Sequence, residues 1–171
     1  SLTLKNSIVF APTSVGREGL DFYEKIAKGG ASLIILPDIS VIPSMLGAPS
    51  LGSLQYADYF RKVVEICHRY DCKVSVQLFH PEYDVDYIGS LYRQRGKISS
   101  DEVHRLLAEN MMAYADTLTT EQADAIVEKF AAAARNAREE GVDMIQIHGD
   151  RLIGSFSSAL FNHRTDRYAP H

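Results

Sequence analysis

Four short apolar segments alternate with amphipathic segments, and this alternation constrains the fold of the chain more than any other feature. The apolar segments are Ile8 to Ala11, Ser32 to Leu36, Lys73 to Phe79 and Met144 to His148. Runs of this kind are typical of strands that a parallel sheet buries on both faces. The intervening segments 19–28, 57–70 and 122–140 carry apolar residues at helical spacing, which predicts βαβ units. Four such units make half of an eight-stranded barrel, or most of a small open sheet.

The bulk properties exclude several classes of protein. The chain has 171 residues, which predicts a single domain over residues 1–171. The net charge of −4 and the lack of a basic cluster argue against nucleic acid as a partner. No apolar run is long enough for a membrane, and residues 1–8 lack the pattern of a signal peptide. Cys67 and Cys72 lack metal-ligand spacing, so we expect reduced thiols in a cytoplasmic protein.

A long insertion follows the third predicted strand, at about residues 81–118. It contains a polar segment rich in glycine and serine, and its periodicity predicts a short helix over 101–114. Loops of this length in compact domains are usually lids or binding elements. Thr119 stands three residues before Gln122, which predicts a capping box at the start of the next helix.

Polar side chains follow the predicted strands at their carboxyl ends, where parallel α/β folds bind ligands. A hydroxyl at Ser14, an amide at Gln77, an imidazole at His148 and a guanidinium at Arg151 would lie on one rim. Such a set suits a planar heteroaromatic ligand whose edge presents both donors and acceptors. Each residue taken alone can equally serve only to cap the turn that follows its strand.

Several segments, in order along nearly the whole chain, share one resemblance. They are Leu4 to Pro12, Ala27 to Ile35, Val76-Gln77-Leu78-Phe79-His80, Leu118 to Gln122, Ile145 to Gly149 and Asn162 to Tyr168. Together they resemble the old yellow enzyme family, the FMN-dependent NADH:flavin oxidoreductases and enoate reductases. The resemblance implies an α/β fold, the N-terminal half of a TIM (β/α)8 barrel. It also implies FMN as the cofactor and NADH or NADPH as the electron source. The implied reaction is the reduction of an activated C=C bond in a small-molecule substrate.

The resemblance places the flavin against particular residues. The backbone at Ala11, Pro12 and Thr13 would line the ring, and the hydroxyl of Ser14 would reach its carbonyl edge. A hydrogen bond there would tune how readily the ring accepts electrons. Gln77 corresponds to the amide that contacts the pyrimidine part of the ring.

The resemblance also implies catalytic roles for His148 and Arg151, at and after the end of the fourth predicted strand. His148 corresponds to the first of two side chains that hydrogen-bond the oxygen of an unsaturated carbonyl substrate, which stabilises enolate charge as hydride arrives from the flavin. The family's second imidazole and its tyrosine are absent, because Asp150 and Arg151 follow Gly149 directly in a shortened segment. Arg151 could replace the imidazole as a donor, but a guanidinium does not release a proton at neutral pH.

Three further positions bear on the resemblance. Asp38 stands where the family prefers a small residue beside the flavin, and a carboxylate there would disfavour a reduced, anionic ring. Arg164 and Asp166 are predicted to form a structural ion pair in the last segment.

Two alternatives stay open at the level of sequence. The fold could be a flavodoxin-like open sheet, although the loop after the first strand lacks a clear phosphate-binding signal. The chain could also be a truncated, non-catalytic half barrel or an assembly module that needs a partner chain. Its open edges and apolar inner face predict a homo-oligomer or a complementary half-barrel chain, burying Val9, Ile35, Val76 and Ile145. We expect weak FMN binding by this chain alone, because the family's phosphate contacts lie in the other half.

Overall fold

The computed structural model describes residues 2–13, 19–43, 49–51, 54–94 and 96–170. These residues form two compact units. Unit 1 holds the described residues of 2–43, 49–79 and 129–147, and unit 2 holds those of 80–128 and 148–170. The predicted single domain over 1–171 therefore stays a prediction.

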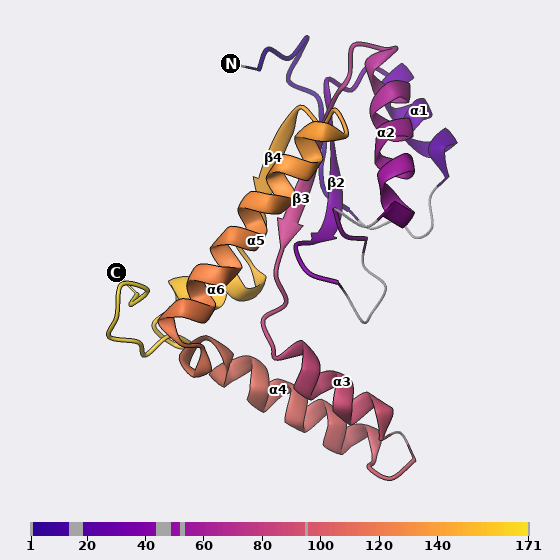
Figure 1. The fold of residues 1–171 in the computed structure, drawn as a ribbon. Coiled ribbons are helices and arrows are strands. Elements are labelled where there is room, and N and C mark those ends of the chain that lie inside the picture. Colours follow the sequence, from indigo (N-terminus) through magenta and orange to yellow (C-terminus); the bar gives the residue numbers. More distant parts are fainter. Residues whose placement is uncertain (1, 14–18, 44–48, 52–53, 95, 171) are drawn as a thin grey trace. The chain divides into compact units, whose positions relative to one another are not determined.

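Unit 1 is built on a four-stranded parallel sheet (Figure 1). Its strands are β1 (Val9–Phe10), β2 (Leu33–Ser40), β3 (Lys73–Phe79) and β4 (Met144–Ile147). They lie in the order β1-β2-β3-β4, and each neighbouring pair is parallel. Strand order that follows chain order, with a helix between strands, is the arrangement of a (β/α) barrel. The predicted parallel architecture is confirmed.

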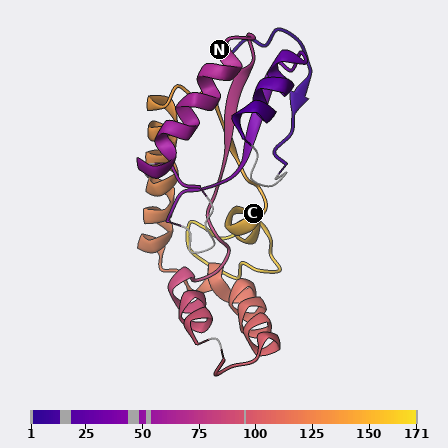
Figure 2. The same ribbon diagram turned by 90° about the vertical axis from the view of Figure 1, so that its right-hand side faces the viewer.

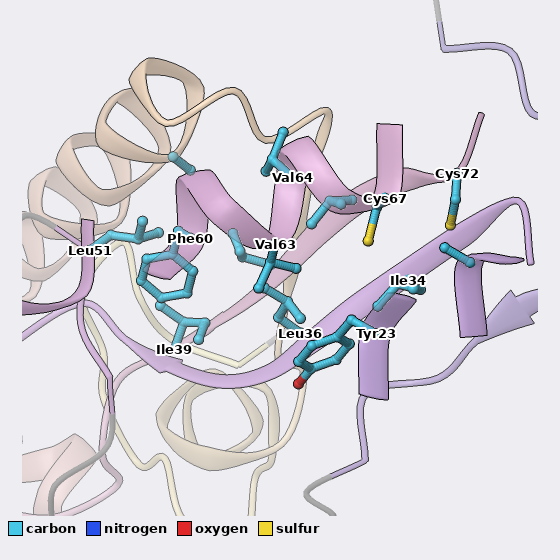
Figure 3. Close-up of a cluster of buried hydrophobic side chains, with 14 of the residues drawn as sticks. Tyr23, Ile34, Leu36, Ile39, Leu51, Phe60, Val63, Val64, Cys67 and Cys72 are labelled. Atoms are coloured by element: carbon cyan, nitrogen blue, oxygen red, sulfur yellow. The ribbon is translucent and has the colours of Figure 1, made fainter. Parts of the chain in front are cut away.

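The helices of unit 1 cover one face of the sheet. Helices α1 (Leu20–Lys28) and α2 (Leu54–His68) lie side by side in both views (Figures 1 and 2). Figure 3 shows the core that they form with β2 and β3. The buried members from the strands are Ile34, Leu36, Ile39, Val74, Val76 and Leu78, and those from α2 are Phe60, Val63, Val64 and Cys67. The α2 residues recur every three or four positions, so they form the apolar stripe that the sequence predicts. Complete burial of a side chain such as Phe60 contributes about 2–3 kcal/mol.

The four residues predicted to form one self-association surface do not lie on one face of the sheet. Val76 lies in the core beneath the helices, and Ile145 packs against that core. Val9 is the register partner of Leu33, so its side chain lies on the same face as those of Leu33 and Ile35. This face is opposite to the one that carries Val76. Successive side chains of one strand point to opposite faces, and the register places Val76 and Ile145 on one face and Val9 and Ile35 on the other, so the four cannot share one surface. Self-association itself stays a prediction.

Strand β2 runs four residues further than predicted. The boundary at Leu36 rested on Pro37, the first of several prolines and glycines that predict an irregular loop after this strand. Instead, the register shifts between Leu36 and Ile39, and Ile39 and Ser40 pair again with β3. Asp38 has φ +54°, in the left-handed region that Asp tolerates better than most residues. This bulge accommodates a proline, which cannot donate to the ladder, without ending the strand.

Helix α5 (Thr120–Glu139) begins with the predicted capping box. The Gln122 backbone N–H donates to the Thr119 hydroxyl at 3.2 Å, and the Thr119 N–H donates to the Gln122 side-chain oxygen at 2.7 Å. Both bonds satisfy N–H groups that the helix itself leaves without partners. Ala133 and Ala137, in the second half of α5, belong to the core of unit 1.

Unit 2 contains a helical hairpin where the sequence predicts mostly loop. Helices α3 (Val85–Arg93) and α4 (Ser100–Thr117) lie side by side (Figures 1 and 2). The predicted helix over 101–114 is part of α4, whereas α3 is not predicted. Each begins with a side-chain cap: Asp84 accepts from the N–H of Tyr87 at 2.9 Å, and Ser99 accepts from that of Glu102 at 3.2 Å. A third helix, α6 (Arg151–Ser157), follows β4 and is also not predicted.

None of the helices built by the described residues has the length and apolar character needed to cross a membrane. Cys67 and Cys72 are both free thiols, buried at the junction of α2 and β3 (Figure 3). In the described part of the chain, no group of His, Cys, Asp or Glu side chains is arranged to hold a metal ion.

Candidate active site

Two glutamine side chains meet at the carboxyl ends of neighbouring strands in unit 1. Gln77 of β3 pairs in register with Gln146 of β4, so both side chains leave the sheet on the same face. The Gln77 amide nitrogen donates to the Gln146 side-chain oxygen at 2.8 Å. The bond leaves one amide oxygen and further N–H groups of the pair for other partners. Gln146 was missed by sequence reasoning; its signal was one polar residue between Ile145 and Ile147.

The residues predicted to line a flavin directly follow β1, also in unit 1. Ala11 and Thr13 are exposed, and Pro12 is half-buried. Ser14 lies outside the described residues, so its predicted hydrogen bond stays a prediction. Asp38, the carboxylate predicted to lie beside the ring, is half-buried at the β2 bulge.

His148 follows β4 directly and belongs to unit 2. Its Nδ1 accepts a hydrogen bond from the backbone N–H of Asp150 at 3.2 Å. An imidazole nitrogen that accepts carries no proton, so the ring hydrogen lies on Nε2. The ring is therefore oriented as a donor through Nε2.

Arg151 has a constrained backbone and a charged partner. Its φ is +58°, in the left-handed region that non-glycine residues rarely adopt. A guanidinium nitrogen, Nη1, lies 3.2 Å from Oε1 of Glu82. The Arg151 side chain is 41% exposed, whereas that of Glu82 is 12% exposed. Strained residues of this kind are concentrated at functional sites. Sequence reasoning missed Glu82 because it does not follow a strand directly.

The turn before α6 depends on a glycine. A Cβ on Gly154 would lie 3.0 Å from the carbonyl oxygen of Gly149, tighter than nine in ten real Cβ contacts. The Gly154 N–H also donates to the carbonyl of Asp150 at 3.3 Å. Gly154 therefore lets α6 pack closely on the turn that carries His148 and Arg151.

The last segment of unit 2 is fixed by the predicted ion pair of Arg164 and Asp166, which is confirmed. Arg164 also donates to the carbonyl oxygens of Ala115 and Leu118, and its side chain is 7% exposed. The Arg164 guanidinium and then the Thr120 hydroxyl hold the pKa of the Asp166 carboxyl well below its usual range. These contacts join the segment after α6 to the ends of α4 and α5, which is a structural role.

Three comparisons with known proteins bear on this geometry. Residues 1–169 match the model of the NADH:flavin oxidoreductase / NADH oxidase family. Proteins described as bilirubin reductases, from Mediterraneibacter gnavus and Clostridium symbiosum, are each 37% identical over 98% of this chain. The chain spans 27% and 46% of their respective lengths. Old Yellow Enzyme from Pichia sp. AKU4542 superposes with a TM-score of 0.77 at 23% identity, over 98% of this chain and 49% of its own.

The protein therefore belongs to the NADH:flavin oxidoreductase / NADH oxidase family. This class consists of oxidoreductases, and it implies FMN and NADH or NADPH as cofactors. The structural match, together with the parallel sheet in chain order, confirms the predicted fold as the N-terminal half of a TIM barrel. The same match excludes the flavodoxin-like alternative.

The residues of unit 1 fit one edge of this cofactor. The pyrimidine edge of a flavin presents carbonyl acceptors and an N–H donor within one plane. The amide pair of Gln77 and Gln146 offers the complementary N–H groups and oxygen on a single face of the sheet. No charge has to be buried there, as the edge of an oxidised flavin is neutral.

Proposed function

We propose that this protein is an FMN-dependent reductase of a C=C bond conjugated to a carbonyl group, with NADH or NADPH as the electron source. Its family supports the reaction class, and the two bilirubin reductases at 37% identity support a conjugated substrate. Bilirubin contains C=C bonds conjugated to carbonyl groups, so its reduction belongs to this class of reaction. The substrate of this protein is accordingly a conjugated, carbonyl-bearing molecule.

The observation that carries this proposal is the hydrogen-bonded pair of Gln77 and Gln146, which joins β3 and β4 at their carboxyl ends. In our proposal these two amides hold the pyrimidine edge of FMN, and the backbone of Ala11, Pro12 and Thr13 lines the ring. When bound, FMN would supply the hydride that reduces the C=C bond.

His148 and Arg151 are proposed to bind the carbonyl oxygen of the substrate. His148 would donate through Nε2, because its Nδ1 is already engaged by Asp150. Arg151 would donate a second hydrogen bond in place of a second imidazole. Negative charge that develops on the oxygen is then stabilised by two fixed donors. Arg151 keeps its protons at neutral pH, so the proton that completes the reduction comes from another donor.

FMN titration, followed by quenching of flavin fluorescence, tests the cofactor part of the proposal. We expect Gln77→Leu to weaken FMN binding about tenfold, as expected for loss of one or two hydrogen bonds in a shielded site. Gln94→Leu is a matched control, since Gln94 is an exposed amide at the end of α3 whose side chain donates to the Ser90 carbonyl. Equal FMN affinities for the wild type and Gln77→Leu would contradict the proposed role of the amide pair.

A further inference from the structure

The ion pair of Glu82 and Arg151 is asymmetric in its exposure. The Glu82 carboxylate is largely covered, whereas much of the Arg151 side chain reaches solvent. One carboxylate oxygen, Oε1, contacts the guanidinium at 3.2 Å. The other, Oε2, is buried and has no hydrogen-bond partner among the described residues. The charge of Glu82 is therefore offset mainly by Arg151.

Backbone contacts hold Glu82 next to the start of α6. The segment that leads to Glu82 begins at His80, whose carbonyl oxygen accepts from the N–H of Leu152 at 3.4 Å. His80 is buried, and its Nδ1 lies 2.8 Å from the carbonyl oxygen of Pro81. The chain that leads to Glu82 is thus held by contacts of its own, in addition to the attraction of the carboxylate to Arg151.

A third polar group, the phenol of Tyr83, is affected by both charges of the pair. Burial raises the pKa of the neighbouring Tyr83 phenol, the Glu82 carboxylate raises it further, and the Arg151 guanidinium lowers it. Both charges therefore act on a third, partly buried group. Because the Glu82 carboxylate is largely covered, its charge affects what else the neighbouring guanidinium can bind.

We propose that Glu82 is a specificity-determining residue, which restricts Arg151 to neutral carbonyl oxygens and disfavours carboxylates. A carboxylate ligand at Arg151 would be attracted by the guanidinium and repelled by Glu82, and the two effects largely cancel. A neutral carbonyl needs only an N–H donor, which Arg151 supplies while it is paired. This inference rests on the proposed function, because it takes Arg151 as the group that binds the substrate oxygen.

Benzamide and benzoate are suitable probes because they have the same shape and differ in charge. Their dissociation constants are measured by calorimetry at one fixed ionic strength, with FMN present, for the wild type and for Glu82→Gln. We expect Glu82→Gln to shift the ratio of the two constants at least about tenfold towards benzoate. Benzamide affinity should change by less than about threefold, since a single neutral hydrogen bond is barely affected.

A matched control and a second variant keep the test decisive. Glu102→Gln removes a carboxylate from an exposed pair with Arg105 on α4, so both affinities should stay unchanged. Glu82→Asp moves the charge away from Arg151 and should shift the ratio partly in the same direction; it decides the question if Glu82→Gln does not fold.

A ratio that is unchanged in a folded Glu82 variant would overturn this inference and leave the proposed function intact. A purely structural pair would give that result together with a lower melting temperature. Wild-type protein that binds FMN but neither probe would overturn the proposed role of Arg151, and this inference with it.

Discussion

The backbone N–H of Asp150 donates to Nδ1 of His148 at 3.2 Å, and this bond fixes which imidazole nitrogen can act as a donor. The bond arises from the turn itself, because the donor is only two residues beyond the acceptor. A shortened segment after β4 therefore still orients the histidine.

Replacing His148 by alanine removes one of two proposed donors to the substrate oxygen. Loss of one such donor typically costs about 3 kcal/mol in the transition state, so we expect kcat/KM to fall roughly a hundredfold. FMN affinity should change little, since His148 is assigned to the substrate. His104→Ala, at an exposed position of α4, serves as the control. Equal losses in flavin and substrate binding would contradict this assignment.

Gly154→Ala tests the close packing of α6. The added Cβ would lie 3.0 Å from the Gly149 carbonyl oxygen, and backbone cannot move as easily as a side chain. We expect unfolding free energy to fall by about 1–3 kcal/mol, measured by urea denaturation. Gly149→Ala is the matched control, because a Cβ there meets nothing within 4 Å. A Gly154→Ala protein as stable as the wild type would show that the turn can relax.

Asp166 is expected to make stability depend on pH. Its pKa is lowered in the folded protein, chiefly by Arg164, so the folded state binds its proton less readily than the unfolded state. The contribution is therefore present above the ordinary Asp pKa of about 3.9 and is lost as pH falls below it. Asp166→Asn should lower stability at pH 7, and the difference from the wild type should shrink at pH 3. Urea denaturation at both pH values measures this, and a difference independent of pH would contradict it.

Thr119→Ala removes one of the two bonds of the α5 capping box. The Gln122 N–H then loses its acceptor, which typically costs about 1 kcal/mol. Thr117→Ala is a useful comparison, because that hydroxyl bonds only to the Tyr114 carbonyl within α4. Thermal unfolding should show a lower melting temperature for Thr119→Ala than for Thr117→Ala. The reverse order would argue against the capping role.

Local sequence patterns were sufficient to predict most of unit 1. Apolar runs such as Lys73–Phe79 are buried on both faces, and the α2 stripe of Phe60, Val63 and Cys67 repeats at helical spacing. Both signals lie within a few residues, where backbone geometry alone determines the pattern. Helix α3 was missed although its buried residues Ile88 and Leu91 stand at helical spacing, because the whole stretch 81–118 was interpreted as a loop with one short helix.

The candidate site was less predictable because its contacts join distant parts of the chain. The bond of Gln77 to Gln146 and that of Arg151 to Glu82 each span 69 positions. The strand-end rule identified Gln77 and Arg151, since each stands at or just after a strand. It could not identify Gln146 and Glu82 as their partners, because register and loop path are properties of the folded chain.

The bulge of β2 adds one residue to this strand that has no partner on β3. Leu36 and Ile39 stand three positions apart, whereas their partners on β3, Val76 and Leu78, stand two apart. One residue of Pro37–Asp38 is thus surplus to the ladder, and a chain lacking it would keep every pairing and every apolar side chain on its present face. The left-handed backbone of Asp38 belongs to the bulge that admits Pro37 into the strand. A deletion of one of these two residues is therefore expected to remove the bulge near the carboxyl end of β2 and to leave the pairing of Leu36 and Ile39 with β3 in place.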